Sequence, residues 1–173
     1  MSENKVDVAI MMGSKSDLEI MRPAAKIAES LGLAVEVRVL SAHRTPDEAA
    51  AYVKDATRRG VKAFICGAGG AAHLGGAVAA HTTRPVIAVP IANGALSGWD
   101  SLLAMVQMPP GLPCATVAVD GAENAGLLAA QIAATADAEI AKKLVAEREG
   151  RRKKVLKSDA EEAAQFGNVK QPG

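Results

Sequence analysis

Five short apolar runs, separated by longer segments with helical spacing, constrain the fold of this chain more than any other feature. Most of these runs are apolar at nearly every position rather than alternating with polar residues, which is typical of strands in a parallel sheet that helices cover on both faces. Strand and helix therefore alternate five times, and this pattern predicts a three-layer α/β/α domain. The expected strands are Val6–Met12, Ala34–Leu40, Ala63–Cys66, Val86–Val89 and Ala115–Val119.

The chain has 173 residues, which is enough for one such domain and too few for two. Five βα units favour a flavodoxin-like order of the parallel five-stranded sheet, in which ligands bind beyond the C-terminal strand ends where the order reverses. After Asn124 we predict one long C-terminal helix that continues to about Glu149. Residues 1–150 are thus expected to form a single α/β/α domain, and residues 151–173 a polar tail that is partly helical or disordered.

The middle of the chain is unusually poor in charge. Between Ala63 and Val119 the only charged residues are Arg84 and Asp100. A membrane span is disfavoured there, because the charge-free run 63–83 is interrupted by clustered glycines. A domain of this size cannot hide the whole segment in its own core, so part of it is expected at a subunit interface. The sequence therefore predicts a homo-oligomer.

Composition also disfavours several classes of partner and cofactor. The net charge is only +1, which gives no long-range attraction to nucleic acid or to an anionic membrane. One Trp, one Tyr and two Phe are too few to form a stacking platform for single-stranded nucleic acid. His43, His73 and His81 lack the spacing of metal ligands, so we expect no metal site.

The two cysteines and the N-terminal segment carry no sign of secretion. Cys66 and Cys114 lie in apolar surroundings without a partner at redox or metal-ligand spacing, and both are expected to be small buried residues. The segment Met1–Asp7 is polar, and the apolar stretch after it is too short for a signal peptide. A cytoplasmic location is expected.

The end of the first strand combines a helix start with hydroxyl groups. Ser14, Ser16 and Asp17 lie where free amide groups at a helix N-terminus can bind a phosphate, and the carboxylate of Asp17 can accept from sugar hydroxyls. The alternative is purely structural, because Ser16 and Glu19 have the spacing of a capping box. The segment is therefore either an anion site or a well-capped helix.

The end of the second strand combines a histidine and an arginine in one loop, which indicates a function more specifically. Ser41, His43 and Arg44 lie in a strand-to-helix loop, where arginine can fix a phosphate while histidine transfers protons near neutral pH. The following helix is expected to begin cleanly, because Thr45 and Glu48 again have capping-box spacing and proline follows Thr45 at the first helical position. We favour a functional role for this loop.

The third strand is followed by the glycine-rich segment Gly67–Leu74. It superficially matches a dinucleotide-binding motif, but the acidic residue expected about twenty positions later is missing, so a nicotinamide site is disfavoured. The glycines are instead expected to let backbone approach a small flat ligand, and His73 either lines that site or is a hydrogen-bonded residue of a buried helix. The loops 90–101 and 107–113 are further candidates for the site wall.

These strand ends together resemble a known family. The motifs that carry the resemblance are Met12–Asp17, Ser41–Pro46, Gly67–Leu74 and Ala95–Ser101 followed by Gln107–Pro109, in this order and with unbroken spacing between Val6 and Leu144. They look like class I N5-carboxyaminoimidazole ribonucleotide mutase of purine biosynthesis. The resemblance implies a flavodoxin-like catalytic domain assembled as a homo-octamer. The implied activity is to move a carboxyl group from the exocyclic nitrogen of an aminoimidazole ribonucleotide to the adjacent ring carbon, without ATP, metal or biotin. An ATP-dependent enzyme that makes the substrate is the implied functional partner.

The resemblance also implies roles for individual residues. His43 is the implied proton carrier, because one imidazole can both give and take a proton near neutral pH. Carbon dioxide released from the substrate would be trapped beside the imidazole ring until it recombines. The implied ribose-phosphate ligands are Ser14, Asp17 and Arg44 with help from Ser16 and Ser41, and the implied carbon dioxide site is made by Ala68, Gly69, Gly70, His73 and Leu74.

Three other functions stay open. A sister class carboxylates aminoimidazole ribonucleotide with free carbon dioxide, but it typically has lysine in place of Arg44 and an Arg-Ser-Asn pattern in place of residues 70–72, so this chain resembles the mutase more closely. A non-catalytic phosphate- or flavin-binding domain with the same fold would not need His43 between two phosphate contacts. An oligomeric scaffold would explain the charge-poor segment but not the residues at the strand ends.

Overall fold

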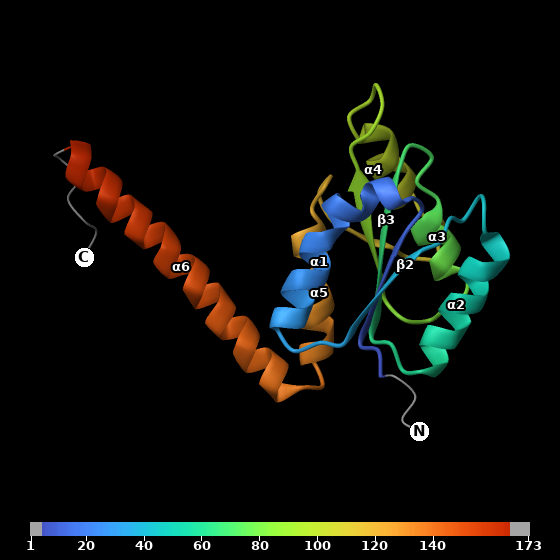
Figure 1. Ribbon diagram of the computed structural model, residues 1–173, viewed down its shortest axis with the longest axis horizontal. Coiled ribbons are helices and arrows are strands. Elements are labelled where there is room, and N and C mark those ends of the chain that lie inside the picture. Colours follow the sequence, from blue (N-terminus) through green and yellow to red (C-terminus); the bar gives the residue numbers. More distant parts are fainter. Residues whose placement is uncertain (1–4, 167–173) are drawn as a thin grey trace.

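The computed structural model describes residues 5–166, which form a three-layer α/β/α domain with one long projecting helix (Figure 1). All strands are parallel and lie in the order β2-β1-β3-β4-β5, so the predicted fold class and flavodoxin-like order are confirmed. The strands are β1 (Val8–Met12), β2 (Val35–Val39), β3 (Ala63–Gly69), β4 (Val86–Ile91) and β5 (Ala115–Thr116). The helices are the short 3-10 helix η1 (Lys15–Asp17), α1 (Leu18–Ser30), α2 (Pro46–Arg58), α3 (Leu74–Ala79), α4 (Trp99–Val106), α5 (Ala122–Ala134) and α6 (Ala138–Phe166).

Successive residues of the strands serve two separate cores. In β1, Val8, Ile10 and Met12 pack with α1 and α5, whereas Ala9 and Met11 belong to the core under α2 and α3. All five of these side chains are fully buried. A strand that is buried on both faces must be apolar at every position, which is why the sequence shows continuous rather than alternating runs.

The contact between α1 and α5 depends on a glycine. A Cβ atom on Gly126 would lie 2.4 Å from Cγ2 of Ile27 and 2.6 Å from the backbone oxygen of Ala24. Gly126 is buried, so the two helices approach each other more closely here than any larger residue allows. This contact holds α1, and with it the loop after β1, against the sheet.

A buried carboxylate lies at the N-terminal ends of the strands and connects them. Asp7 is 3% exposed, accepts a hydrogen bond from the Ala34 N–H, and lies 3.3 Å from the ammonium nitrogens of Lys5 and Lys62. Burial alone would raise the pKa of Asp7, but the hydrogen bond from Ala34 and the nearby ammonium group of Lys62 outweigh it and hold this pKa below its ordinary value. The pairing joins the residues that precede three neighbouring strands.

The observed strand lengths differ from the predicted ones mainly at the last strand. Strands β3 and β4 extend to Gly69 and Ile91, beyond the predicted ends, whereas β5 contains only two residues. After β5 the chain still bonds to β4 through the N–H groups of Val117 and Asp120, but Asp120 has a positive φ of 56°, which ends the regular strand. The polypeptide turns there toward α5.

The prediction of one continuous helix after Asn124 is wrong. Helix α5 ends at Ala134, and α6 begins at Ala138. Between them the Thr135 hydroxyl donates to the Ile132 carbonyl oxygen, and the carboxylate of Asp137 accepts from the N–H groups of Glu139 and Ile140. Side chains that bond to nearby backbone in this way end one helix and cap the next.

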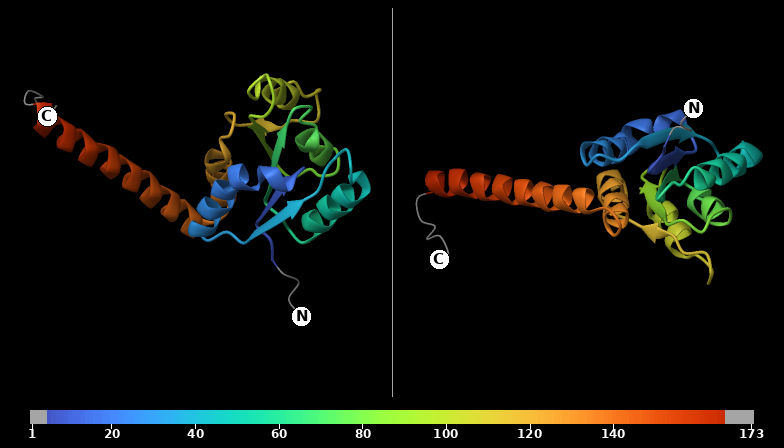
Figure 2. Two further views of the ribbon diagram at one scale, coloured as in Figure 1. Left: turned by 45° about the horizontal axis from the view of Figure 1, so that its top comes forward. Right: turned by 90° about the horizontal axis from the view of Figure 1, so that it is seen from below.

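The predicted long C-terminal helix is present and is longer than expected. Helix α6 starts beside α5 and extends away from the domain in all three views (Figures 1 and 2). Residues 151–166 of the expected polar tail continue this helix, and residues 167–173 lie outside the described part of the chain. No helix within residues 5–166 is both long and apolar enough to cross a membrane.

The cysteine prediction holds for one residue only. Cys66 is fully buried in β3, but Cys114 is only half-buried. Burial raises the pKa of both thiols. Neither side chain lines the cavity described below.

Candidate active site

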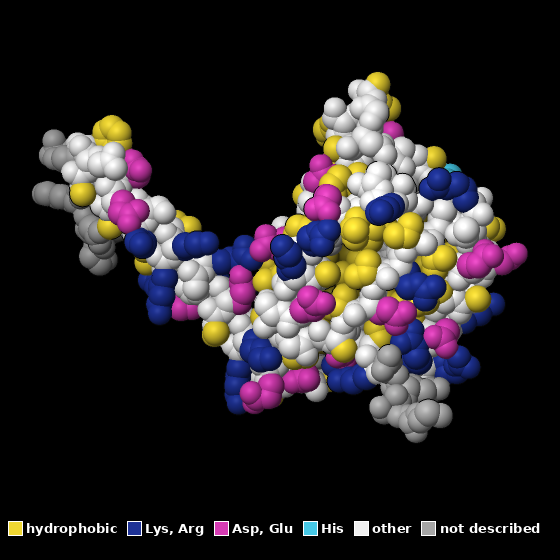
Figure 3. All heavy atoms as spheres, in the orientation of Figure 1, with side chains coloured by type: hydrophobic (Ala, Val, Ile, Leu, Met, Phe, Trp, Pro, Cys, Tyr) yellow, Lys and Arg dark blue, Asp and Glu magenta, His cyan; other side chains and the backbone are white. Residues whose placement is uncertain are grey.

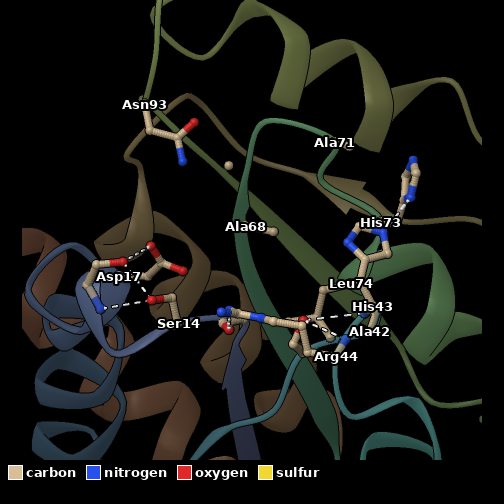
Figure 4. Close-up of a pocket in the computed structure, with 14 residues that line it drawn as sticks. Ser14, Asp17, Ala42, His43, Arg44, Ala68, Ala71, His73, Leu74 and Asn93 are labelled. Atoms are coloured by element: carbon tan, nitrogen blue, oxygen red, sulfur yellow. Dashed lines mark hydrogen bonds between the residues drawn. The ribbon is translucent and has the colours of Figure 1, made fainter.

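A cavity of about 410 Å³ opens at the C-terminal ends of β1 to β4 (Figure 4). It lies at the switch point between β1 and β3, where the strand order reverses, which is where ligands bind in open α/β sheets. Loops from the three strand ends singled out in the sequence meet here, together with one residue after β4. Its walls are formed by Gly13, Ser14, Ser16, Asp17, Ser41, Ala42, His43, Arg44, Ala68, Gly69, Ala71, His73, Leu74 and Asn93.

The wall after β1 is a cluster of hydroxyl and carboxylate oxygens. The Ser14 hydroxyl accepts from the N–H and the hydroxyl of Ser16, at 3.3 Å and 2.8 Å, and caps η1. The Ser16 hydroxyl also lies 3.2 Å from Oδ1 of Asp17, a carboxylate that is 9% exposed. The predicted capping box of Ser16 and Glu19 does not form, because Ser14 is the cap and Glu19 pairs with Arg22 instead.

The wall after β2 is a tight turn organised by Ser41 and Thr45. The Thr45 hydroxyl accepts from the Ser41 N–H at 2.8 Å and donates to the Ser41 carbonyl oxygen. The Ser41 hydroxyl in turn accepts from the N–H groups of His43 and Arg44. The predicted capping box of Thr45 and Glu48 is therefore wrong, because the Thr45 hydroxyl is used within the turn, although Pro46 does occupy the first helical position.

Arg44 reaches across the cavity toward the loop after β1 (Figure 4). Its Nη2 donates to the Gly13 carbonyl oxygen at 2.6 Å. No ion pair joins this guanidinium to an acidic residue anywhere between residues 5 and 166. Its remaining N–H groups and its charge are thus available for an anion beside Ser14 and Ser16.

Two histidines from different strand ends meet at the other side of the cavity. Nε2 of His43 lies 2.8 Å from Nδ1 of His73, and the rings are nearly perpendicular with centroids 4.9 Å apart. Both residues are exposed. Of the two interpretations left open for His73, the structure supports the one in which it lines the site, because it stands at the start of α3 and not inside a buried helix.

The remaining wall combines backbone at the end of β3 with a residue that the sequence did not single out. Ala68, Gly69 and Leu74 line the cavity as predicted, but Gly70 does not; its positive φ of 60° shapes the turn that follows. Asn93 lies over Gly69 so closely that a Cβ atom there would be 2.1 Å from the asparagine Nδ2. Only glycine at position 69 permits this contact.

Of the two candidate wall loops, one contributes and the other does not. Asn93 comes from the loop after β4, and its side-chain amide places a hydrogen-bond donor and an acceptor over the cavity. The loop 107–113 contributes no residue to this cavity; part of it lines a separate groove with Arg84. Asn93 lay within a predicted loop, but no motif distinguished it from its neighbours.

The arrangement separates two kinds of chemistry along one cavity. One end presents hydroxyls, the buried carboxylate of Asp17 and an unpaired guanidinium, which suits a sugar phosphate. The other end presents an imidazole ring beside small apolar residues and backbone, which suits proton transfer to a flat ring. No group of three or more metal-ligating side chains occurs within the described chain.

Known proteins match most of this chain. A sequence profile of AIR carboxylase covers residues 7–154. An N5-carboxyaminoimidazole ribonucleotide mutase of Pyrococcus horikoshii is 53% identical over 144 residues, covering 83% of this chain and 81% of the relative. One of Bacillus subtilis is 52% identical over 153 residues, covering 87% of this chain and 94% of the relative.

The fold agrees with these matches. A crystal structure of Treponema denticola PurE aligns with a TM-score of 0.81 at 29% identity, and the alignment covers 89% of this chain and 96% of that chain. The family match, over residues 7–154, includes every strand end that forms the cavity. The chain belongs to the AIR carboxylase family.

Proposed function

We propose that this protein is an N5-carboxyaminoimidazole ribonucleotide mutase, an isomerase of de novo purine biosynthesis. It converts N5-carboxyaminoimidazole ribonucleotide into 4-carboxyaminoimidazole ribonucleotide by decarboxylation and recarboxylation. The observation that carries the proposal is that His43 lines the same cavity as Arg44 and the hydroxyl and carboxylate side chains that suit a sugar phosphate. A domain that only binds phosphate has no use for a proton carrier in that position.

The polar end of the cavity binds the ribose phosphate. Arg44 supplies the positive charge, and the seryl hydroxyls supply hydrogen-bond donors. Asp17 is a buried acceptor that suits sugar hydroxyls. The proposed ligands are Ser14, Ser16, Asp17, Ser41 and Arg44.

His43 carries the proton in both halves of the reaction. In the first half the bond between the exocyclic nitrogen and the carboxyl carbon breaks, carbon dioxide leaves, and the imidazolium of His43 gives a proton to that nitrogen. In the second half the ring carbon bonds to carbon dioxide, and the neutral imidazole takes the proton which that carbon loses. The histidine ends in its starting state, so the cycle consumes no ATP.

The apolar end of the cavity holds carbon dioxide between the two halves. Short side chains leave room beside the imidazole ring, and Asn93 closes the cavity over Gly69. Holding the two reactants together makes recombination faster than escape. The proposed residues are Ala68, Gly69, Gly70, His73 and Leu74, with Gly70 acting through the turn that it forms.

The activity is tested by incubating the purified protein with freshly prepared N5-carboxyaminoimidazole ribonucleotide in the absence of ATP. We expect rapid formation of the ring-carboxylated isomer at low bicarbonate. Conversion only of aminoimidazole ribonucleotide with added carbon dioxide would favour the sister carboxylase, and binding without conversion would favour a binding protein.

The proposed functional partner is the ATP-dependent enzyme that makes the substrate. The cytoplasmic location expected from the sequence remains a prediction.

Replacing Arg44 by alanine should raise KM by about 10- to 100-fold and change kcat only a few-fold. A hydrogen bond to a charged group contributes about 1.5–3 kcal/mol to binding, and the phosphate lies away from the reacting atoms. Steady-state kinetics measure both constants. The matched control is Lys15→Ala, which removes a nearby exposed cation that does not line the cavity. An equal rise of KM in that control would show that Arg44 acts only through general charge.

The proposed homo-oligomer rests on an apolar stripe within the charge-poor segment. Leu96, Trp99, Leu103 and Val106 are 51–66% exposed and recur at intervals of three or four residues along and before α4. Exposed large apolar residues that share one face of a helix are typical of a protein interface. The number of subunits, expected to be eight, remains a prediction.

Introducing a charge into this stripe should break the proposed interface. We expect Leu103→Glu to reduce the mass of the assembly at micromolar concentration by at least half, because an interface core does not tolerate an unpaired charge. Light scattering measures the mass. Ser16→Ala is a suitable control because its exposed side chain lies far from α4 in sequence and lines the cavity instead. A wild-type monomer would contradict the proposal.

A further inference from the structure

Asn93 holds an unused hydrogen-bonding group at the wall of the active-site cavity. A Cβ atom on Gly69 would lie 2.1–2.7 Å from Nδ2, Cγ and Oδ1 of Asn93, so the amide fills the space that a larger residue at position 69 would occupy (Figure 4). The Asn93 side chain makes no hydrogen bond within residues 5–166. Its two N–H donors and its oxygen acceptor are therefore available to a ligand in the cavity.

The backbone that carries this amide is fixed on both sides. The buried Ser101 hydroxyl donates to the last carbonyl oxygen of β4 at 3.0 Å, and Oδ1 of Asp120 accepts from the Ala92 N–H at 3.0 Å. Asp120 has a positive φ of 56°, a conformation that persists only where the surrounding structure imposes it. At the far end of the loop, a Cβ atom on Gly98 would lie 2.6 Å from Cγ1 of Val119. The amide is thus held in place before a ligand arrives, which favours binding.

The loop between β4 and α4, which carries Asn93, brings no charge to the cavity. Residues 92–99 include no Asp, Glu, Lys or Arg. In the orientation of Figure 1 this loop projects at the top of the molecule beside α4, and Figure 3 shows neither dark blue nor magenta side chains at its tip. A ligand that contacts the loop from the cavity therefore meets a neutral amide.

A neutral donor suits the one group that changes charge in the proposed reaction. The carboxyl group of the substrate is negative, becomes neutral carbon dioxide, and is negative again in the product. A cation would stabilise the charged substrate more than the transition state that leads to carbon dioxide, and would therefore slow decarboxylation. An amide N–H can donate to both forms, because the oxygen atoms of carboxylate and of carbon dioxide are acceptors.

The other polar side chains of the cavity have other partners or proposed ligands. Nε2 of His43 and Nδ1 of His73 lie 2.8 Å from each other. Arg44 and the seryl hydroxyls are the proposed phosphate ligands, and Asp17 is an acceptor. Among the side chains that line the cavity, the Asn93 amide is thus the donor without another assigned partner.

We infer that the side-chain N–H of Asn93 donates a hydrogen bond to the carboxyl group of substrate and product, and to carbon dioxide between the two halves of the reaction. The inference rests on the proposed mutase function and adds to it a residue that distinguishes carboxylated from uncarboxylated ribonucleotides. The amide binds this group and transfers no proton, so its role is separate from that of His43.

Equilibrium binding of two ligands tests the inference. Calorimetry compares 4-carboxyaminoimidazole ribonucleotide with aminoimidazole ribonucleotide, which lacks the carboxyl group, in the His43→Asn background so that neither is converted during the titration. We expect Asn93→Ala to weaken binding of the carboxylated ligand about 10- to 100-fold, the usual contribution of a hydrogen bond to a charged group, and to change binding of the other ligand less than about threefold. Asn93→Asp should weaken binding of the carboxylated ligand further, because its carboxylate repels that of the ligand.

Asn124→Asp is the matched control, since it adds the same charge at an exposed asparagine that lines a separate groove. It should leave both affinities unchanged. Equal losses for the two ligands in the Asn93 variants would indicate a contact with the sugar or a structural role, and would overturn the inference. An unchanged affinity for the carboxylated ligand would overturn it as well.

The enzymatic proposal is tested separately, by conversion in protein that retains His43. If that protein binds the carboxylated ligand but converts no N5-carboxyaminoimidazole ribonucleotide, the enzymatic proposal is wrong, and the comparison of affinities still tests Asn93. If it binds neither ribonucleotide, both proposals are wrong.

Discussion

Replacing His43 by asparagine should lower kcat for the mutase reaction by about 10²- to 10⁴-fold, the usual contribution of a general acid–base residue. Asparagine keeps a side chain of similar size that can hydrogen-bond to His73, so the cavity should keep its shape. It cannot carry a proton at neutral pH. The proton of the substrate's ring carbon then loses its proposed acceptor, so both proton transfers should slow.

The experiment compares kcat and substrate affinity in the same preparation. Substrate affinity should change little, because the substitution leaves the side chains proposed to bind the phosphate in place. His81→Asn is the matched control, since His81 is also an exposed histidine but lies at a separate groove with Arg84. A variant of His43 that retains kcat within tenfold of the wild type would refute its role as the proton carrier.

Replacing Gly126 by alanine should lower the free energy of unfolding by about 3 kcal/mol, the upper part of the usual range for overpacking a core. The added methyl group would meet not only the end of Ile27 but also the backbone of Ala24, and backbone cannot rotate away. Helices α1 and α5 would have to separate along the face that covers β1 and β3. The loop with Ser14 would move with α1.

Gly150→Ala is the matched control for this prediction. Gly150 also lies inside a helix, but a Cβ atom there would meet nothing within 4 Å. Alanine at an open helical position leaves stability unchanged or raises it by up to about 1 kcal/mol. Urea unfolding at one protein concentration measures both variants. An equal effect of the two substitutions would contradict a specific role for the α1–α5 contact.

The fold was predictable because burial on both faces of a parallel sheet leaves a strong signal in sequence. Strands such as Val8–Met12 are apolar at every position, and helices between them repeat five times. Strand ends were less predictable, because Gly67–Gly69 and Pro90–Ile91 pair with a neighbour despite residues that are rare in strands. Their pairing is set by the register of the sheet rather than by local preference.

Most of the cavity residues could also be predicted, because the loops after neighbouring parallel strands must meet at the C-terminal edge of the sheet. His43, Arg44 and Asp17 could be placed there before their contacts were known. The contacts themselves were less predictable. Ser14 and Thr45 have the residue types of caps, yet which hydroxyl bonds to which amide depends on a turn of three or four residues. Neither proposed capping box formed for this reason.

The position of Asn93 and the break before α6 depend on tertiary structure. Asn93 reaches the cavity only because Gly69 on a neighbouring strand lacks a side chain, and this pair is distant in sequence. At Thr135–Asp137 the sequence has neither glycine nor proline, and the signal was the capping type of Asp137. Asp137, as a capping residue, therefore predicts the division of the long helix into α5 and α6.

The central claim, that a carboxyl group leaves and rejoins the substrate within one cavity, is tested most directly by isotope transfer. N5-carboxyaminoimidazole ribonucleotide labelled with ¹³C at its carboxyl carbon is incubated briefly with the protein in unlabelled bicarbonate and without ATP, and the ring-carboxylated product is analysed by mass spectrometry. If His43 and the backbone of Gly69 hold carbon dioxide until it recombines, most of the product should retain the label. Product that carries the isotope ratio of the bulk bicarbonate would contradict the account.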